Sequence, residues 1–194
     1  MNSIFRIIFI SQFVGLLLFL PAAAQDSPHA GIPLEAIEVN LDGQSYGLGY
    51  RRYPEPFAVE MSGSAGNPDS AYGSARGFWL ALAMGLDYDA VAAWTRAVDG
   101  KSSPRPSDEA AHMNTAREVL AGGVLLFGEI DYGDYRIFIY RYPKSIPRNL
   151  GLPVRRFGNR YYVVTNLVEA DPLAKRMSAL RWDMDRLRAE HPAQ

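Results

Sequence analysis

Residues 123–168 read GVLLFGEIDYGDYRIFIYRYPKSIPRNLGLPVRRFGNRYYVVTNLV. Aromatic and β-branched runs alternate in this stretch with residues suited to tight turns, at Asp131–Asp134 and at Gly158-Asn159. Such runs, separated by short turns that contain glycine, are typical of antiparallel hairpins. The stretch therefore predicts an antiparallel sheet, one face of which the flanking helical segments could cover.

An earlier segment, residues 34–41, alternates apolar and polar side chains and predicts one more strand. Asp42-Gly43 follows it as a turn signal, so we expect residues 45–53 to form the return strand. Pro54 and Pro56 lack the backbone N–H that a sheet ladder uses, and we expect them to interrupt that strand.

Helical periodicity precedes the predicted sheet. A first helix begins near Asp69 or Ser70, either of which can cap its free N–H groups, and Gly85 is placed to end it. Asp87 can cap a short second helix, and Ser107 can cap a third. A last helix is expected after the sheet, starting at Asp171-Pro172 as cap and first-turn proline, with a narrow apolar seam formed by Leu173, Met177, Leu180, Met184 and Leu187.

The N-terminus has the layout of an export signal. Arg6 provides a positive charge, residues 7–20 are mostly apolar, and small residues precede Gln25. The apolar run is short for a membrane anchor, which needs roughly 20 residues. We therefore expect residues 1–24 to be a cleaved signal peptide and the protein to be periplasmic or secreted.

The remaining chain divides into a disordered mature N-terminus at residues 25–33 and a single α+β domain at residues 34–191. Its 20 Lys and Arg residues nearly balance 21 Asp and Glu residues, which leaves no basic footprint for nucleic acid. The chain contains no cysteine, so an exported domain of this size must be held by packing without disulfides.

The most concentrated polar feature is EIDYGDY at residues 129–135. Glu129, Tyr132 and Tyr135 are the candidate catalytic residues, because carboxylates beside tyrosines can transfer protons or bind hydroxyl-rich sugars. Asp131 and Asp134 also suit a hairpin turn that contains glycine, which is the structural interpretation.

Other chemical signals are weaker. Glu109 and His112 fall on one helix face and could supply two metal ligands, but no second such pair exists. We therefore expect His112 to be solvated or to serve as a cap, and we expect no metal and no cofactor. Arg155-Arg156 and Arg160 flank the Gly158 turn as a basic tip, which is either solvated or binds an anionic partner. A nucleophile elbow and a nucleotide fingerprint are both absent from the sequence.

The order of elements resembles the nuclear-transport-factor-2-like (cystatin-like) superfamily over residues 67–168. Asn67-Pro68-Asp69-Ser70 opens a helix that ends in Ala83-Met84-Gly85-Leu86, and Asp87-Tyr88-Asp89-Ala90 opens a short second helix. The resemblance implies a curved sheet wrapped on helices with a pocket between them. Some members, the ketosteroid isomerases among them, use an Asp base and a Tyr donor there. The expected fold is thus α+β, a curved antiparallel sheet packed on N-terminal helices, with a C-terminal amphipathic helix.

Three functions are compatible with these patterns. The first is an exported, non-enzymatic binding or interaction protein of the bacterial envelope, namely an accessory protein or an immunity protein of the inhibitor type. Its partner would be an envelope protein or a small ligand. The second is a small-molecule enzyme that uses the pocket, which a buried carboxylate with a raised pKa would favour. The third is a polysaccharide-binding protein, but Trp79 and Trp94 are both expected to face the core. The absence of a catalytic constellation favours the first.

Overall fold

The structure is a computed structural model that describes residues 28–29, 31–41, 44–63 and 66–165. The expected signal peptide, its junction at Gln25 and the expected helix after Asp171 lie outside these ranges. None of the helices within them has the length and apolar character that crossing a membrane requires. The elements are β1 (Glu35–Leu41), β2 (Gln44–Ala58), α1 (Ala71–Ala83), α2 (Tyr88–Ala92), β3 (Thr95–Ala97), α3 (Glu109–Leu120), β4 (Leu125–Tyr132), β5 (Tyr135–Tyr142), β6 (Ile146–Phe157) and β7 (Arg160–Thr165).

The described part of the chain has an α+β fold with one seven-stranded sheet, in the order β1-β2-β4-β5-β6-β7-β3. Neighbouring strands run antiparallel except β3, which runs parallel to β7. The sheet is therefore mixed, which corrects the expectation of a purely antiparallel sheet. No pattern in the sequence indicated β3, because three residues are too few to show a period.

Two-residue turns set the registers of the predicted hairpins. Tyr132 pairs with Tyr135 across the β4–β5 turn, and Phe157 pairs with Arg160 across the β6–β7 turn. Each turn begins with a glycine at positive φ, 52° at Gly133 and 62° at Gly158. A residue with a Cβ is strained in that conformation, so the glycines fix these turns where the sequence predicted them.

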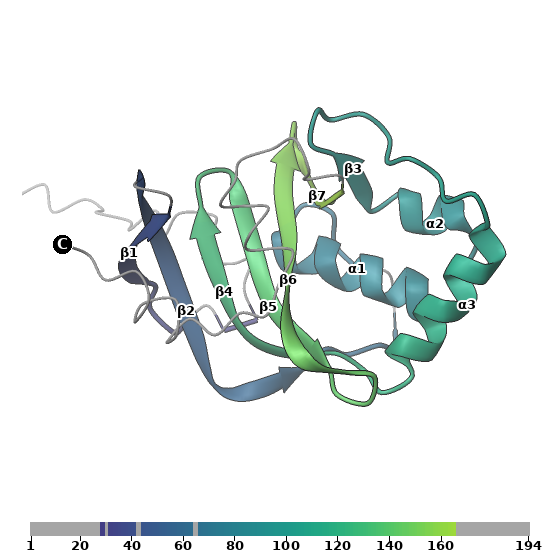
Figure 1. Cartoon of the computed structure of the whole chain (residues 1–194), viewed down its shortest axis with the longest axis horizontal. Helices are drawn as coiled ribbons and strands as arrows, with labels where there is room; N and C mark the ends of the chain where they lie inside the picture. The colour runs from purple at the N-terminus through teal and green to yellow at the C-terminus, as the bar shows by residue number, and fades with distance from the viewer. Residues whose placement is uncertain (1–27, 30, 42–43, 64–65, 166–194) are drawn as a thin grey trace, which may run out of the picture.

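The second strand is longer than predicted, because β2 continues through Pro54 and Pro56 to Ala58. Both prolines lie where the register between β2 and β4 shifts, between Arg52 and Phe57. They also lie beyond Tyr50, where the pairing with β1 ends. Proline is tolerated at such places because no regular ladder bond requires its missing N–H. β2 bends strongly near its end and closes the sheet toward the helices (Figure 1).

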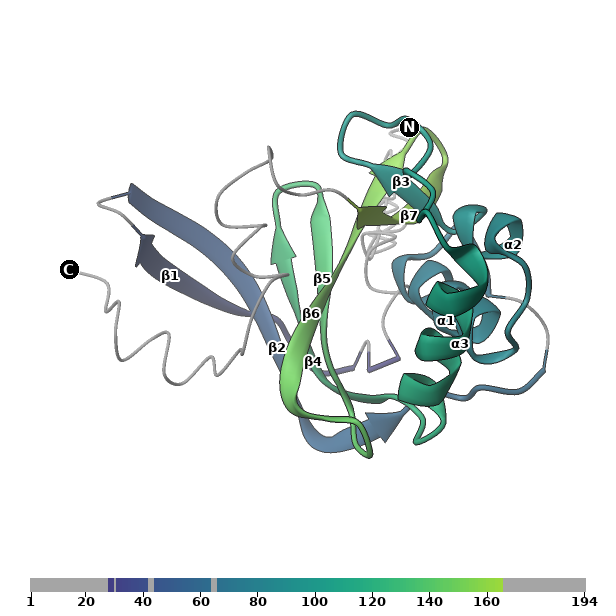
Figure 2. The same cartoon turned by 45° about the vertical axis from the view of Figure 1, so that its right-hand side comes forward.

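The three helices lie together on one side of the sheet (Figure 2). Ser70 caps α1 by accepting a hydrogen bond from the Gly73 N–H at 2.9 Å, and Gly85 adopts a φ of 60° just beyond its end. Asp87 caps α2 as expected, whereas Asp108 rather than Ser107 caps α3. The predicted cap was therefore wrong by one residue. Both Ser and Asp side chains can cap a helix, and the packing of α3 selects Asp108.

The sheet separates two apolar clusters. The larger cluster joins the helices to the inner face of the sheet through residues such as Trp79, Met113 and Phe138. The smaller cluster contains only strand residues, among them Val39, Ile130 and Ile137, and lies on the outer face. Both sets are almost completely buried.

The residues just ahead of β1 contact the domain. The His29 ring lies 4.4 Å from the Tyr53 ring and 5.3 Å from the Phe57 ring, centroid to centroid. The Ile32 carbonyl accepts a hydrogen bond from Arg51. Described residues of the stretch 25–33 thus pack against β2.

Candidate functional site

The first polar feature of the site is a buried ion-pair network on the inner face of the sheet. Glu129 on β4 is 0% exposed and pairs with Arg51, its neighbour in register on β2. Arg136 Nη1 on β5 lies 3.5 Å from Glu129 Oε2, and Arg136 also pairs with Asp131, its register partner on β4. Opposite charges therefore alternate across three adjacent strands.

The face on which the network lies is fixed by the strand period. Glu129 stands opposite Phe138 in register, and the Phe138 ring lies 6.1 Å from the Tyr72 ring of α1. Because alternate residues of a strand share a face, Asp131 and Arg136 also lie on the side of α1. The network thus continues the helix-covered core toward the β4–β5 turn.

Burial has a measurable consequence at Asp131. Desolvation raises the pKa of its carboxyl above 3.8, although the guanidinium of Arg136 opposes that shift. Asp131 was expected in the turn, but it lies inside β4 and only Gly133 and Asp134 form the turn. The carboxylate therefore faces the end of the helix-covered layer instead of open solvent.

A polar pocket of about 520 Å³ lies at this end of the sheet. The first residue of α1, Ala71, forms one wall, and the β4–β5 and β6–β7 turns form the others. Residues with charged or hydroxyl-bearing side chains dominate its lining, namely Asp131, Asp134, Tyr135, Arg136, Arg156 and Tyr161. The ring of Tyr135 itself packs against the outer apolar cluster. Two hydrogen bonds to the backbone of Tyr161 hold α1 and its lead-in segment against β7. The Tyr161 N–H donates to the Pro68 carbonyl at 2.8 Å, and Ser74 Oγ donates to the Tyr161 carbonyl at 2.7 Å.

The three candidate catalytic residues are not brought together. Glu129 is enclosed on the inner face, whereas Tyr132 and Tyr135 pack against the outer apolar cluster. Tyr132 stacks edge-on with Tyr46 at 6.1 Å, and Tyr135 lies beneath the Arg155 guanidinium at 5.4 Å. Of the three, Tyr135 alone lines the pocket among the described residues.

The predicted basic tip splits between the two faces of the sheet. Arg155 pairs with Asp134 at 3.0 Å, and Arg160 lies over the Tyr162 ring at 5.6 Å. Arg156 takes the inner face and lines the pocket. The tip is therefore not one basic surface, because adjacent strand residues point in opposite directions.

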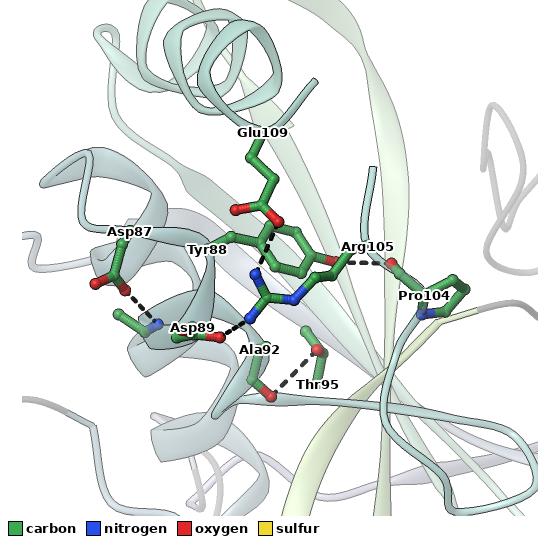
Figure 3. Close-up of polar contacts among 9 residues, drawn as sticks. Asp87, Tyr88, Asp89, Ala92, Thr95, Pro104, Arg105 and Glu109 are labelled. Atoms are coloured by element: carbon green, nitrogen blue, oxygen red, sulfur yellow. Dashed lines mark hydrogen bonds and ion pairs between the residues drawn. The ribbon is translucent and has the colours of Figure 1, made fainter. Parts of the chain in front are cut away.

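A second polar cluster connects the loop between β3 and α3 to the helices α2 and α3 (Figure 3). Arg105 pairs with Asp89 on α2 and with Glu109 on α3, the latter at 2.8 Å. Tyr88 Oη donates to the Pro104 carbonyl at 2.9 Å. These contacts are mostly exposed and hold loop and helices together.

This cluster also accounts for the Glu109 and His112 pair. Glu109 faces Arg105, and the His112 ring lies edge-on to Tyr88 at 6.4 Å. Within the described ranges no group of three or more acidic, His or Cys side chains is placed to hold a metal ion.

Arg51 and Arg136 are the site residues that sequence reasoning missed. Arg136 lies in the apolar run of β5, on the same face of the strand as Phe138 and Tyr140, both of which are buried. A charge at an inward position of a strand is the signal that could have identified it. Arg51 offered no comparable signal, because its partner is distant in the sequence.

Comparisons of the chain with protein-family models, with curated proteins and with solved structures find no significant match.

Proposed function

We propose that this chain is an exported, non-enzymatic binding protein whose ligand site is the polar pocket at the N-terminus of α1. The observation that carries the proposal is the state of the acidic side chains there. Glu129 is fully buried, so a ligand in the pocket does not reach it. Asp131 is paired with Arg136, and Asp134 with Arg155. Carboxylates engaged in this way shape a charged surface for recognition and are poorly placed to abstract a proton.

One observation favours the alternative, an enzyme. Asp131 lines the pocket with a raised pKa, and Tyr161 lines the same pocket. Carboxylates with raised pKa values are common among general bases. In such an enzyme, Asp131 would accept the proton and Tyr161 would donate a hydrogen bond.

The experiment that separates the two functions recovers the tagged protein from the envelope fraction of its native host. Small molecules released on denaturation and proteins that copurify are both identified by mass spectrometry. A small molecule bound in near-stoichiometric amount, and recovered unchanged after overnight incubation with fresh protein, supports binding. Conversion of that molecule supports the enzyme. A protein partner with an empty pocket contradicts the pocket as the site of recognition.

Export is proposed from the N-terminal pattern alone. Cleavage before Gln25 predicts that N-terminal sequencing of the protein from the periplasm or the medium begins at that residue. A protein that retains Arg6 in the membrane fraction would contradict cleavage.

We further propose that the domain belongs with the nuclear-transport-factor-2-like proteins. The support is the order of a capped helix, a short helix and a later set of hairpins, together with a bent sheet that has helices on one side. A pocket between α1 and the sheet is also what the resemblance implies. An experimental structure with a different strand order would contradict this assignment.

The amphipathic helix expected after Asp171 is proposed to cover the outer face of the sheet. Its support is the outer apolar cluster, whose members Leu48, Ile130 and Ile137 are at most 4% exposed although α1, α2 and α3 pack on the inner face. A chain truncated after residue 165 should then bind a hydrophobic dye and unfold at a lower temperature. An unchanged melting temperature would contradict the proposal.

A further inference from the structure

The charges around the pocket do not cancel. Arg136 is held by Asp131 and Glu129, Glu129 is held by Arg51, and Asp134 is held by Arg155. On the inner face, the pocket and the network beneath it hold three arginines, Arg51, Arg136 and Arg156, against the two carboxylates of Glu129 and Asp131, which leaves one positive charge. Asp134 in the turn is paired with Arg155, which reaches it from the outer face. The positive charge that no carboxylate balances is that of Arg156.

Arg156 keeps most of its hydrogen-bonding capacity. Its Nε donates to the Gly158 carbonyl at 3.1 Å, and its guanidinium carbon lies 6.0 Å from the Tyr161 ring centroid. No carboxylate among the described residues forms an ion pair with it. The terminal nitrogens of a guanidinium match the two oxygens of a carboxylate or phosphate, so Arg156 is suited to hold such a group.

Arg136 strengthens the positive potential at the inner wall of the pocket. It is 8% exposed; its Nε pairs with Asp131, whereas its Nη1 makes no hydrogen bond within the described residues. Its ion pair with Glu129 is long, at 3.5 Å. A buried guanidinium with incomplete hydrogen bonding is stabilised by a further negative charge nearby.

The start of α1 adds to the same field. Ala71, its first residue, lines the pocket, and the first turn of this 13-residue helix contains no acidic side chain. Ser70 satisfies the Gly73 N–H, so the partial positive charge of the remaining N-terminal N–H groups faces no carboxylate of the helix itself.

We propose that the pocket binds the oxyanion group, a carboxylate or a phosphate, of a small polar ligand, and that Arg156 is the side chain that contacts it. The proposal rests on the assignment of this pocket as the ligand site and names the class of ligand. Asp131 and Tyr161 then face the polar remainder of the ligand.

The test is a titration of the full mature chain, followed by NMR, with four small probes at constant ionic strength: acetate, inorganic phosphate, methylammonium and glycerol. The reporters are the backbone amides of Ala71, Gly133 and Gly158 and the Nε–Hε signal of Arg156. Acetate or phosphate should shift them saturably, and the Arg156→Gln variant should weaken that binding at least tenfold. Arg160→Gln is the matched control, because Arg160 lies in the same hairpin on the opposite face and should leave the affinity unchanged.

The outcomes separate the class of ligand from the site. Saturable shifts with methylammonium or glycerol but not with either oxyanion would overturn the oxyanion class and keep the pocket as a binding site. No saturable shift with any probe would overturn both. Equal losses in Arg156→Gln and Arg160→Gln would show a general charge effect and refute the role of Arg156. If only one of the two anions binds, that result identifies the recognised group: a carboxylate if acetate binds, and a phosphate if inorganic phosphate binds.

Discussion

Replacing Glu129 by Gln should destabilise the domain strongly. The substitution keeps the shape of the side chain and removes its charge, which leaves Arg51 and Arg136 buried at 5% and 8% exposure with one carboxylate fewer. Breaking a buried ion pair by removing one partner costs about 3–5 kcal/mol. With a urea dependence of roughly 2 kcal/mol per molar, the unfolding midpoint should fall by about 1.5–2.5 M.

Urea unfolding followed by tryptophan fluorescence measures this loss, since Trp79 is fully buried in the folded state. Glu109→Gln is the matched control. Glu109 also pairs with an arginine, but the two side chains of that pair are 39% and 54% exposed. Exposed pairs contribute about 0–1 kcal/mol, so the control should lower the free energy of unfolding by no more than that.

A second variant tests the reason for the loss. The double substitution Arg51→Met with Glu129→Leu removes both charges and leaves Arg136 paired with Asp131. Replacing a buried pair by apolar residues of similar volume is often neutral, so most of the lost stability should return. The reasoning is refuted if Glu129→Gln costs no more than Glu109→Gln, or if the double variant is less stable than Glu129→Gln.

Two further predictions concern the first turn of α1 and the carboxyl of Asp131. Gly73→Ala should lower the free energy of unfolding by about 1–3 kcal/mol in thermal or urea unfolding, because the new Cβ would overlap the Asn67 backbone, 2.7 Å from its nitrogen. Carboxyl ¹³C NMR should give Asp131 a pKa above 3.8, since burial outweighs the attraction of Arg136. Its contribution to stability is then fully present below pH 3.8 and is lost as the pH rises through the raised pKa.

These two predictions have clear contradicting results. Alanine has the higher helix propensity, by up to about 1 kcal/mol, so a Gly73→Ala variant of raised stability would show that no clash occurs. For the titration, Asp99 is an internal contrast, because hydrogen bonds from Lys101 lower its pKa. An Asp131 pKa at or below that of Asp99 would contradict the effect of burial. In Asp131→Asn, the corresponding fall in stability with rising pH should disappear.

Local chemistry explains why much of the fold was predictable from the sequence. Gly133 and Gly158 occupy turn positions with positive φ, and Ser70 and Asp87 cap helices through their own side chains. Each of these signals depends on two to four consecutive residues, so it can be recognised in the sequence without knowledge of the tertiary structure.

The site could not be predicted in the same way. Arg51 and Glu129 are separated by 78 positions in the sequence and meet only because β2 pairs with β4. Sequence reasoning therefore grouped Glu129 with Tyr132 and Tyr135, its near neighbours, although strand alternation sends the tyrosines to the opposite face. Arg156 and Ala71 likewise become neighbours only when α1 packs over the sheet.

The sequence by itself determined the α+β class, the tight turns at Gly133 and Gly158 and the capped starts of the first two helices, because these depend on local backbone preferences. Tertiary structure alone decided the short parallel strand β3, the passage of β2 through Pro54 and Pro56, and the charged pocket. Each of these features depends on the neighbouring strand or helix against which a segment packs. The register between two distant segments cannot be read from the sequence of either segment alone.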